Sequence, residues 1–150
     1  IEVHPEVREW DTDLHTEDVE EMYRLFKKFF EELPKNQGQS FLVAKARERL
    51  VGFVGIHRRG GLMSHIGEIG ISVHPDYQGR GIGTKLLMAA VELARKEGFE
   101  RLEADTLANN KPMLKIAEKV GFRLEGVRKM RIKKNGKCLD EALLAITLRS

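Results

Sequence analysis

Residues 65–87 decide the fold, and they read HIGEIGISVHPDYQGRGIGTKLL. An apolar run typical of a β-strand stops at Pro75, and a glycine-rich turn then leads into a helical pattern. Gly79, Gly81 and Gly83 keep three alternate positions of this turn free of side-chain bulk. The first N–H groups of a helix have no intrahelical partner and carry the positive end of the helix dipole. The stretch therefore predicts that an anion, such as a phosphate group, binds at the start of the helix.

The chain has 150 residues, of which 41% are hydrophobic, so it is long enough for one domain with a complete core. Its 26 Lys and Arg exceed its 23 Asp and Glu by three, a charge too small to predict a nucleic-acid partner. No run approaches the length of a membrane span, and we expect no membrane partner. The single cysteine, Cys138, excludes a disulfide within the chain and favours a reducing, cytoplasmic setting. With no base beside it in the sequence, Cys138 is expected to be a packing residue.

Hydrophobic periodicity predicts the element order β-α-β-β-β-α-β-α-β-β within one α/β domain, residues 1–150. The predicted strands are residues 6–10, 40–46, 50–57, 65–74, 101–106, 122–133 and 138–148, and the predicted helices are residues 16–33, 82–97 and the segment from Asn109 or Asn110 to Gly121. Gly126 indicates a bulge, and Asn135-Gly136 is typical of a type I′ hairpin turn. The last strand is apolar on both faces, which favours a covered position inside the sheet.

Three phosphate-binding motifs compete for the glycine-rich turn. A Walker A loop is excluded because Thr84, and not a lysine, follows Gly83. The dinucleotide motif G-x-G-x-x-G is excluded because its last glycine would fall on Thr84 or Leu86. What remains is the pattern Q-x-x-G-x-G, which begins at Gln78 and ends at Gly83.

The segment Gln78-Gly79-Arg80-Gly81-Ile82-Gly83 resembles the acyl-CoA-binding motif [Q/R]-x-x-G-x-[G/A] of the GNAT superfamily of N-acetyltransferases. Asn110 with Glu118-Lys119-Val120-Gly121-Phe122 is similar to the family's N…EK-x-GF segment at the usual spacing. The element order agrees across essentially the whole chain. The resemblance implies a GNAT-like fold, in which helices flank a mixed and mostly antiparallel sheet. It also implies an N-acetyltransferase that uses acetyl-CoA, needs no metal and acts on a primary amine, such as a small amine, an amino acid or a protein N-terminus.

Backbone N–H groups of residues 79–84 are expected to hold the pyrophosphate of coenzyme A, and Arg80 adds positive charge. The resemblance implies that the backbone of residues 71–73 pairs with the pantetheine arm like an added strand, which needs a local splay of the sheet near Gly70. It also implies a hydrogen bond from Asn110 to the same arm, although capping a helix is a simpler role for Asn110. The expected coenzyme-binding residues are Ile71, Ser72, Val73, Gln78, Gly79, Arg80, Gly81, Ile82, Gly83, Thr84 and Asn110.

Acetyl transfer to an amine needs a base that removes a proton from the ammonium group. Glu68 is the first candidate, because a carboxylate on an apolar strand is costly without a use or a partner. Its position resembles that of the general base in some family members, and its alternative role is a structural contact with a neighbouring arginine. Asp105 is the second candidate, five residues before Asn110, where other members carry a catalytic acid. His74 is expected to be a turn residue that faces solvent.

Ala117 departs from the family pattern, because many members carry a tyrosine there that protonates the leaving thiolate. Either Tyr77 or solvent then serves as the acid, and packing under the loop is the simpler role for Tyr77. The preferred interpretation is direct attack by the amine in a ternary complex. The alternative is a non-catalytic acyl-CoA sensor or regulatory domain on the same fold. The sequence leaves open the acceptor and whether the chain forms a homodimer.

Overall fold

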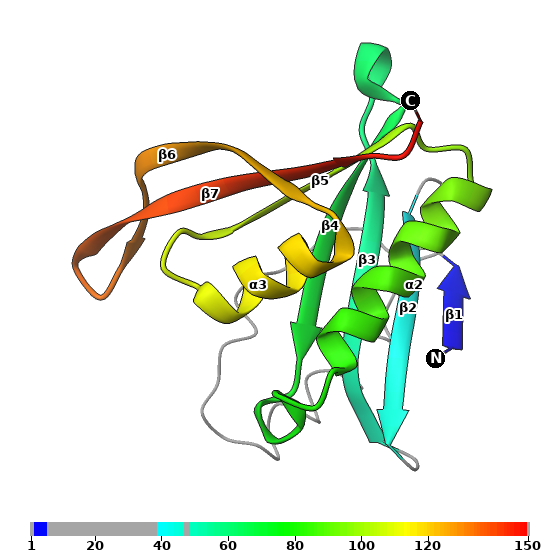
Figure 1. The fold of residues 1–150 in the computed structure, drawn as a ribbon, viewed down its shortest axis with the longest axis horizontal. Coiled ribbons are helices and arrows are strands. Elements are labelled where there is room, and N and C mark those ends of the chain that lie inside the picture. Colours follow the sequence, from blue (N-terminus) through cyan, green and yellow to red (C-terminus); the bar gives the residue numbers. More distant parts are fainter. Residues whose placement is uncertain (1, 6–38, 47–48, 150) are drawn as a thin grey trace.

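The computed structural model describes residues 2–5, 39–46 and 49–149. These residues form a seven-stranded sheet in the order β1-β2-β3-β4-β5-β7-β6, shown in Figure 1. The strands are β1 Glu2–Pro5, β2 Gln39–Ala46, β3 Arg49–Arg58, β4 Ile66–Val73, β5 Arg101–Leu107, β6 Arg123–Lys134 and β7 Lys137–Thr147. The helices are α2 Ile82–Lys96 and α3 Lys111–Val120, with short 3-10 turns η1 Gly61–Met63 and η2 Pro75–Tyr77.

The observed element order confirms the predicted α/β fold over the described part of the chain. Among the described strand pairs only β4 and β5 are parallel, so the sheet is mixed and mostly antiparallel. A first strand is present at Glu2–Pro5, where it pairs with β2. The strand predicted at residues 6–10 and the helix predicted at residues 16–33 lie outside the described residues. The last strand, β7, lies between β5 and β6, which is the covered position that its apolar run predicts.

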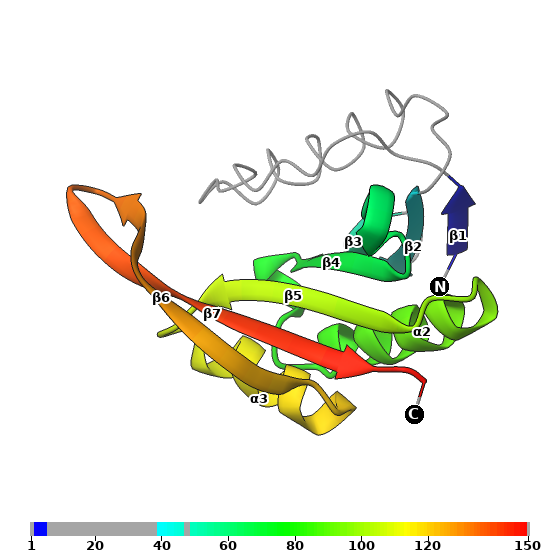
Figure 2. The same ribbon diagram turned by 90° about the horizontal axis from the view of Figure 1, so that it is seen from above.

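Helices α2 and α3 cover the same face of the sheet, as Figure 2 shows from above. The apolar stripe of α2 packs on this face, and Leu86, Leu87 and Leu102 are almost fully buried beneath it. Burying one leucine side chain contributes roughly 1.5–3 kcal/mol, so this layer fixes α2 against the sheet. Gly83 lies in the same contact, because a Cβ there would come within 3.3 Å of Cδ1 of Ile116 on α3.

Strands β4 and β5 pair along only part of their length. Residues 66–69 of β4 pair with residues 101–104 of β5, and this paired part is called the closed half. Farther along, residues 70–73 pair with β3 alone, and residues 105–107 pair with β7 alone. This second part is called the open half, and residues of β6 and β7 are counted with the half that they adjoin. The splay expected near Gly70 is therefore present. In the open half, the backbone edges of β4 and β5 that face each other do not form hydrogen bonds to each other.

The β6–β7 hairpin extends beyond the rest of the sheet (Figure 1). Its turn has the two positive φ angles of a type I′ turn, 51° at Asn135 and 76° at Gly136, as predicted. The bulge predicted at Gly126 is present, and a second register shift between Arg128 and Ile132 was not predicted. Cys138 is exposed, so the expectation that it packs in the interior is wrong. The reason is its place near the tip of the projecting hairpin, where no second layer of the described structure covers it.

Candidate functional site

The glycine-rich turn connects the end of β4 to the start of α2. Gly79 and Gly81 have φ angles of 76° and 81°, the left-handed region that side chains other than glycine enter at a cost. The side-chain amide of Gln78 donates a 3.0 Å hydrogen bond to the carbonyl oxygen of Val73, which ties the turn back to β4. The guanidinium of Arg80 lies 4.9 Å from the centre of the Tyr77 ring. The turn therefore has a defined shape that depends on its glycines.

The start of α2 has unused hydrogen-bond donors. Gly81 is its N-cap and offers no side-chain acceptor, and no acidic residue lies in the first turn. The first intrahelical bond runs from the N–H of Lys85 to the carbonyl of Gly81, at 3.1 Å. The N–H groups of residues 82–84 therefore precede the first intrahelical bond and remain available to an external anion.

The start of α3 differs, because Asn110 caps it with its own side chain. The Asn110 Oδ1 accepts a 3.3 Å hydrogen bond from the N–H of Met113, and its Nδ2 donates one of 3.2 Å to Oγ1 of Thr106. The capping role expected for Asn110 is therefore present. The residue follows β5 directly, at the end of the open half.

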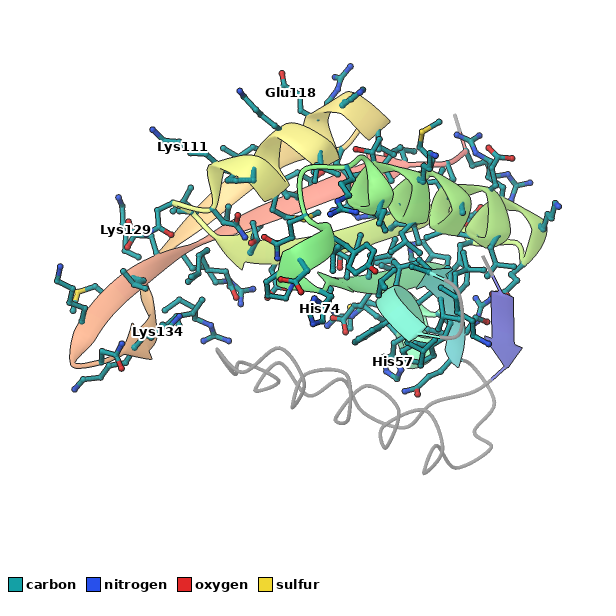
Figure 3. All side chains as sticks on the ribbon, turned by 90° about the horizontal axis from the view of Figure 1, so that it is seen from below. His57, His74, Lys111, Glu118, Lys129 and Lys134 are labelled. Carbon is teal, nitrogen blue, oxygen red and sulfur yellow. The ribbon has the colours of Figure 1, made fainter. Side chains whose placement is uncertain are left out.

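His74 is fully buried, so the expectation that it faces solvent is wrong. Its Nδ1 accepts a 3.1 Å hydrogen bond from the N–H of Asp76, which caps η2, and its own N–H donates to the carbonyl of Val51 at 2.8 Å. The imidazole ring packs edge-on against Tyr77 beneath the glycine-rich turn, and Figure 3 shows His74 among the inner side chains. His74 thus supports the turn from inside.

The carboxylates of the closed half are all held by arginines. Glu68 contacts the guanidinium of Arg59, and the same guanidinium lies 3.6 Å from Glu103. Arg101 in turn donates a 2.9 Å hydrogen bond to Glu103 and also contacts Glu125 on β6. This hydrogen bond from Arg101 is the main cause that lowers the pKa of Glu125. Glu68 is thus the first member of a charge network that crosses the sheet.

The carboxylates of the open half, Asp105 and Glu141, lie beside each other, and Glu141 also has two arginines of β6 in ion-pair range. Asp105 is exposed on β5, and Glu141 on β7 is only 7% exposed. Asp105 opposes Leu143 and Leu107 opposes Glu141, so the two acidic side chains are diagonal neighbours on one face of the sheet. This face is opposite to the one that α2 covers, because Leu102 and Ala104 point to the helix side. Burial, and then the hydrogen bond and negative charge of Asp105, raise the pKa of Glu141.

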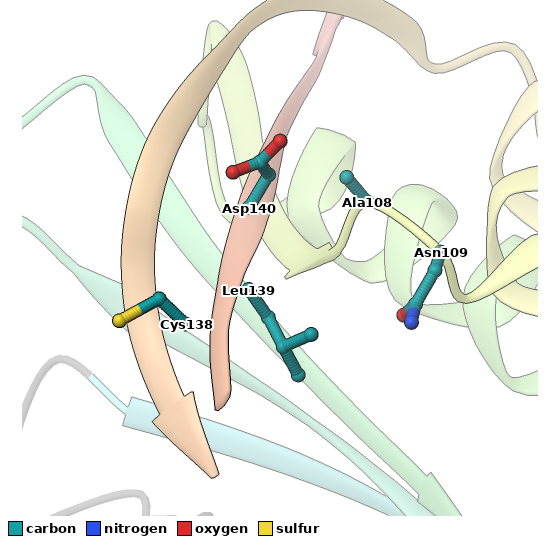
Figure 4. Close-up of a pocket in the computed structure, with 5 residues that line it drawn as sticks. All are labelled: Ala108, Asn109, Cys138, Leu139 and Asp140. Atoms are coloured by element: carbon teal, nitrogen blue, oxygen red, sulfur yellow. The ribbon is translucent and has the colours of Figure 1, made fainter. Parts of the chain in front are cut away.

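A depression lies beyond the open half, where the β5–α3 connection passes the start of β7 (Figure 4). It is lined by Ala108, Asn109, Cys138, Leu139 and Asp140. The Asp140 carboxylate turns away to accept a 2.9 Å hydrogen bond from the N–H of Met130 and lies 3.2 Å from Nζ of Lys129. The depression widens the open end of the splay without adding an evident catalytic group.

The structure thus separates the two predicted acidic candidates, Glu68 in the closed half and Asp105 in the open half. Sequence reasoning missed Glu141 as a site residue, and the signal that could have found it is a charged residue at the start of the apolar run of β7. No helix of the described residues is long and apolar enough to cross a membrane. Within the same residues no three His, Cys, Asp or Glu side chains are arranged to hold a metal ion.

The family model of the GNAT acetyltransferases matches residues 4–122, which is most of the chain. The chain belongs to the acetyltransferase (GNAT) family. The predicted family is thereby confirmed, and this GNAT protein is an acyltransferase that uses an acyl-CoA donor. Its glycine-rich turn, its splay and its uncapped α2 are the parts of the fold that the family motif predicted.

Two curated relatives and one solved structure illustrate the likeness. YjcK of Bacillus subtilis, a probable N-acetyltransferase, is 30% identical over 132 residues, which are 85% of this chain and 72% of YjcK. The N-alpha-acetyltransferase RimI of Mycobacterium tuberculosis is 38% identical over 90 residues, which are 59% of this chain and 55% of RimI. The structure of yncA from Salmonella typhimurium, solved with its cofactor acetyl-CoA, has a TM-score of 0.72 at 24% identity and covers 75% of this chain and 66% of yncA.

Proposed function

We propose that this protein transfers an acetyl group from acetyl-CoA to a primary amine, by direct attack of the amine in a ternary complex. The observation that carries the proposal is the open half of β4 and β5, which lies directly beside the uncapped start of α2. A backbone edge without a partner suits an amide-rich arm, and free helical N–H groups suit a pyrophosphate. The two features lie next to each other along the chain, joined by residues 74–81.

The residues present fit coenzyme A. The backbone of Ile71, Ser72 and Val73 is half-buried and lies along the splay, where it is available for strand-like pairing with the pantetheine arm. The N–H groups of Ile82, Gly83 and Thr84 and the turn at Gly79 to Gly81 would hold the pyrophosphate, with Arg80 exposed nearby. Gln78 shapes the turn through its bond to Val73, and Asn110, at the start of α3, would border the arm beyond the end of β5. Bound acetyl-CoA supplies the thioester whose acetyl group is transferred.

We propose Asp105 as the general base in preference to Glu68. Glu68 already contacts Arg59, and a carboxylate held by a guanidinium is a weaker proton acceptor. Asp105 lies in the open half, where the acetyl group would reach the face of the sheet opposite to α2. Its diagonal neighbour on the same face of the sheet is the carboxylate of Glu141 on β7.

We assign none of the described side chains to the role of the usual tyrosine acid, whose position is occupied by Ala117. Ala117 is 1% exposed and lies within the core, and its methyl side chain cannot donate a proton. Tyr77 packs against His74 and Arg80 on the turn, which is a supporting role. We propose that the departing thiolate, a good leaving group, is protonated by the attacking nitrogen or by solvent.

Relatives point to amines of different sizes as acceptors. The relatives include an L-amino acid N-acetyltransferase of Escherichia coli and the N-alpha-acetyltransferase RimI. We propose a primary amine on an amino acid or on a protein N-terminus, because the open half ends in an exposed depression rather than in an enclosed cavity. No nucleic acid or membrane is part of this proposal.

Calorimetric titration with coenzyme A and acetyl-CoA tests the first step, and we expect saturable binding of both. A thiol-release assay with amino acids, polyamines, aminoglycosides and N-terminal peptides then tests transfer. Release of free coenzyme A that depends on one acceptor class supports the proposed activity. Absence of binding contradicts it. Binding without turnover across the panel supports the alternative, an acyl-CoA sensor, which the missing tyrosine at Ala117 motivates.

A further inference from the structure

Glu141 is a buried carboxylate in the open half that no proposed step uses so far. It is 7% exposed, and its Oε1 has no hydrogen-bond partner among the described residues. An ionised carboxylate in this position loses hydration without full compensation, which costs free energy. The part of β7 that follows it is apolar, with Ala142, Leu144 and Ala145 all buried. A carboxylate kept in such a place needs a physical explanation.

Within the described part of the chain, three charged groups lie around the Glu141 carboxyl, and they come from both neighbouring strands. Arg128 Nη1 and Arg131 Nε, from β6, lie 3.7 Å and 3.9 Å from its Oε1, which is ion-pair range but too long for a hydrogen bond. Both arginines are more than half exposed, so water screens their charge. Asp105, from β5, is the diagonal neighbour of Glu141 on the same face of the sheet. The arginines therefore moderate the negative charge of Glu141, whereas Asp105 is its direct neighbour.

Two carboxyl groups form a hydrogen bond only when one of them carries a proton, because an ionised carboxylate has no donor. Burial and the charge of Asp105 raise the pKa of Glu141, and the two arginines act in the opposite direction. Interacting carboxyl groups lose their protons in two steps that belong to the pair rather than to either residue. When both are ionised, the pair gains a hydrogen bond and relieves a repulsion by taking up one proton.

We propose that Asp105 and Glu141 act as one proton-accepting pair, in which Glu141 is a positioning residue that shares the proton Asp105 takes from the acceptor ammonium. This inference rests on the proposed acetyl transfer at the same site. It assigns a use to the one buried carboxylate of the open half.

The proton balance of the step is simple. Asp105 takes one proton from the ammonium group, and Glu141 shares it in the new hydrogen bond. The freed nitrogen lone pair forms the nitrogen–carbon bond to the acetyl group, and the carbon–sulfur bond breaks with its electron pair on sulfur. The second nitrogen proton goes to the thiolate directly or through water, which yields an amide and a free thiol. The pair then releases its proton to solvent, so no other reactant is consumed.

A carboxyl-carbon NMR titration of the free protein tests the pair without any need for acetyl transfer. In the wild type we expect Glu141 to titrate above the ordinary range of glutamate. In Asp105→Asn its midpoint should fall, because the like charge and the shared proton are gone. A Glu141 midpoint at the ordinary value, or one that Asp105→Asn leaves unchanged, overturns the proposal.

The pH dependence of kcat/KM then tests the positioning role of Glu141. We expect Glu141→Gln to move the acid limb of the profile to lower pH by about one unit and to reduce the plateau about tenfold. The control is Glu125→Gln, which removes a carboxylate from the same face of the sheet but from the arginine network, and should leave the limb in place. If the acid limb of the pH profile of Glu141→Gln stays where it is in the wild type, the proposed pair is overturned, even if the rate falls. If the wild-type protein binds no acetyl-CoA, the proposed function is contradicted. The NMR titration of the free protein then still tests whether Asp105 and Glu141 share a proton.

Discussion

Both the closed half and the open half of the β4–β5 region carry acidic side chains. The two halves differ in the groups that lie next to these carboxylates. In the closed half, the backbone ladder is complete and the carboxylates of Glu68, Glu103 and Glu125 contact Arg59 or Arg101. In the open half, β4 and β5 do not pair, and the carboxylates of Asp105 and Glu141 are neighbours. The two exposed arginines near Glu141 lie in ion-pair range but make no hydrogen bond to it. One pair of strands thus provides a rigid, charge-balanced anchor at one end and an opening with acidic groups at the other.

The difference indicates how the fold separates stability from chemistry. Backbone groups left unpaired inside a sheet cost free energy unless another molecule satisfies them. The open half therefore fits a binding edge, and the closed half keeps the two strands from parting farther. The glycine-rich turn and α2 lie at the end of the open half, where they add phosphate-binding donors to the same opening. The experiments below change one half while leaving the other intact.

The largest expected effect is on catalysis. Asp105→Asn in the open half should lower kcat by about 10²–10⁴-fold, because a general base contributes on that order. Glu68→Gln, the matched change in the closed half, should lower kcat by less than about tenfold, because Glu68 is held by Arg59. Acetyl-CoA affinity, measured by calorimetry, should stay near the wild-type value in both. If Glu68→Gln lowers kcat more than Asp105→Asn does, and only Glu68→Gln loses the pH dependence of the rate, Glu68 is the base.

The next effect concerns coenzyme binding at the turn. Gly81→Val should weaken coenzyme A binding by about 100-fold, because a β-branched residue is strongly disfavoured at a φ angle of 81° and distorts the donors at the start of α2.

The control for this change is Gly98→Val. Gly98 has a φ angle of 84° after the other end of α2, and a Cβ there also meets no atom within 4 Å. Both variants therefore carry similar backbone strain, visible as a lower Tm. Only Gly81→Val should bind coenzyme A more weakly. Equal affinity for coenzyme A in the two variants would show that the glycine-rich turn is not part of the binding site.

The smallest effect is on stability and belongs to the closed half. Arg101→Met should reduce the free energy of unfolding by about 1 kcal/mol, because Glu103 and Glu125 lose charge-assisted hydrogen bonds that are partly exposed to water. Arg95→Met on the exposed side of α2 is the control, and its change should stay within about 0.5 kcal/mol.

The same variant has a defined pH dependence. Arg101 lowers the pKa of Glu125 in the folded state. The contribution of this pair to stability is therefore present above the ordinary pKa of glutamate and is lost as the pH falls through the lowered value. In denaturant titrations at several pH values, Arg101→Met should show a shallower loss of stability in acid. An unchanged acid dependence would contradict the assigned role of this pair.

Most of the fold could be predicted from local patterns. The helix at residues 82–97, the end of the next helix at Gly121 and the Asn135-Gly136 turn each depend on neighbours in the sequence, and all were confirmed. The splay was expected near Gly70 from the family resemblance, and the register of β4 and β5 confirmed it. Glycines, caps and hydrophobic periods report on local geometry, so they can be read without the tertiary structure.

The contacts that assign roles were harder to predict. His74 is buried because β3 accepts its N–H, and Cys138 is exposed because its hairpin projects from the sheet. The partner of Glu68 directly follows β3 and the neighbour of Asp105 lies on β7, so pairing between strands fixes both rather than spacing in the sequence. The second bulge, where Asp140 accepts the N–H of Met130, likewise depends on two strands at once. Such charge partners can be identified only when the pairing register of the strands is known.

The most direct test of the account is amide hydrogen exchange with and without acetyl-CoA. If the open half receives the pantetheine arm, amides of residues 71–73 that do not bond to β3 should exchange more slowly in the complex. The amides of residues 82–84 at the start of α2 should be protected with them, and those of residues 66–69 in the closed half should be unchanged. Saturating acetyl-CoA that leaves residues 71–73 and 82–84 exchanging as in the free protein would contradict the account.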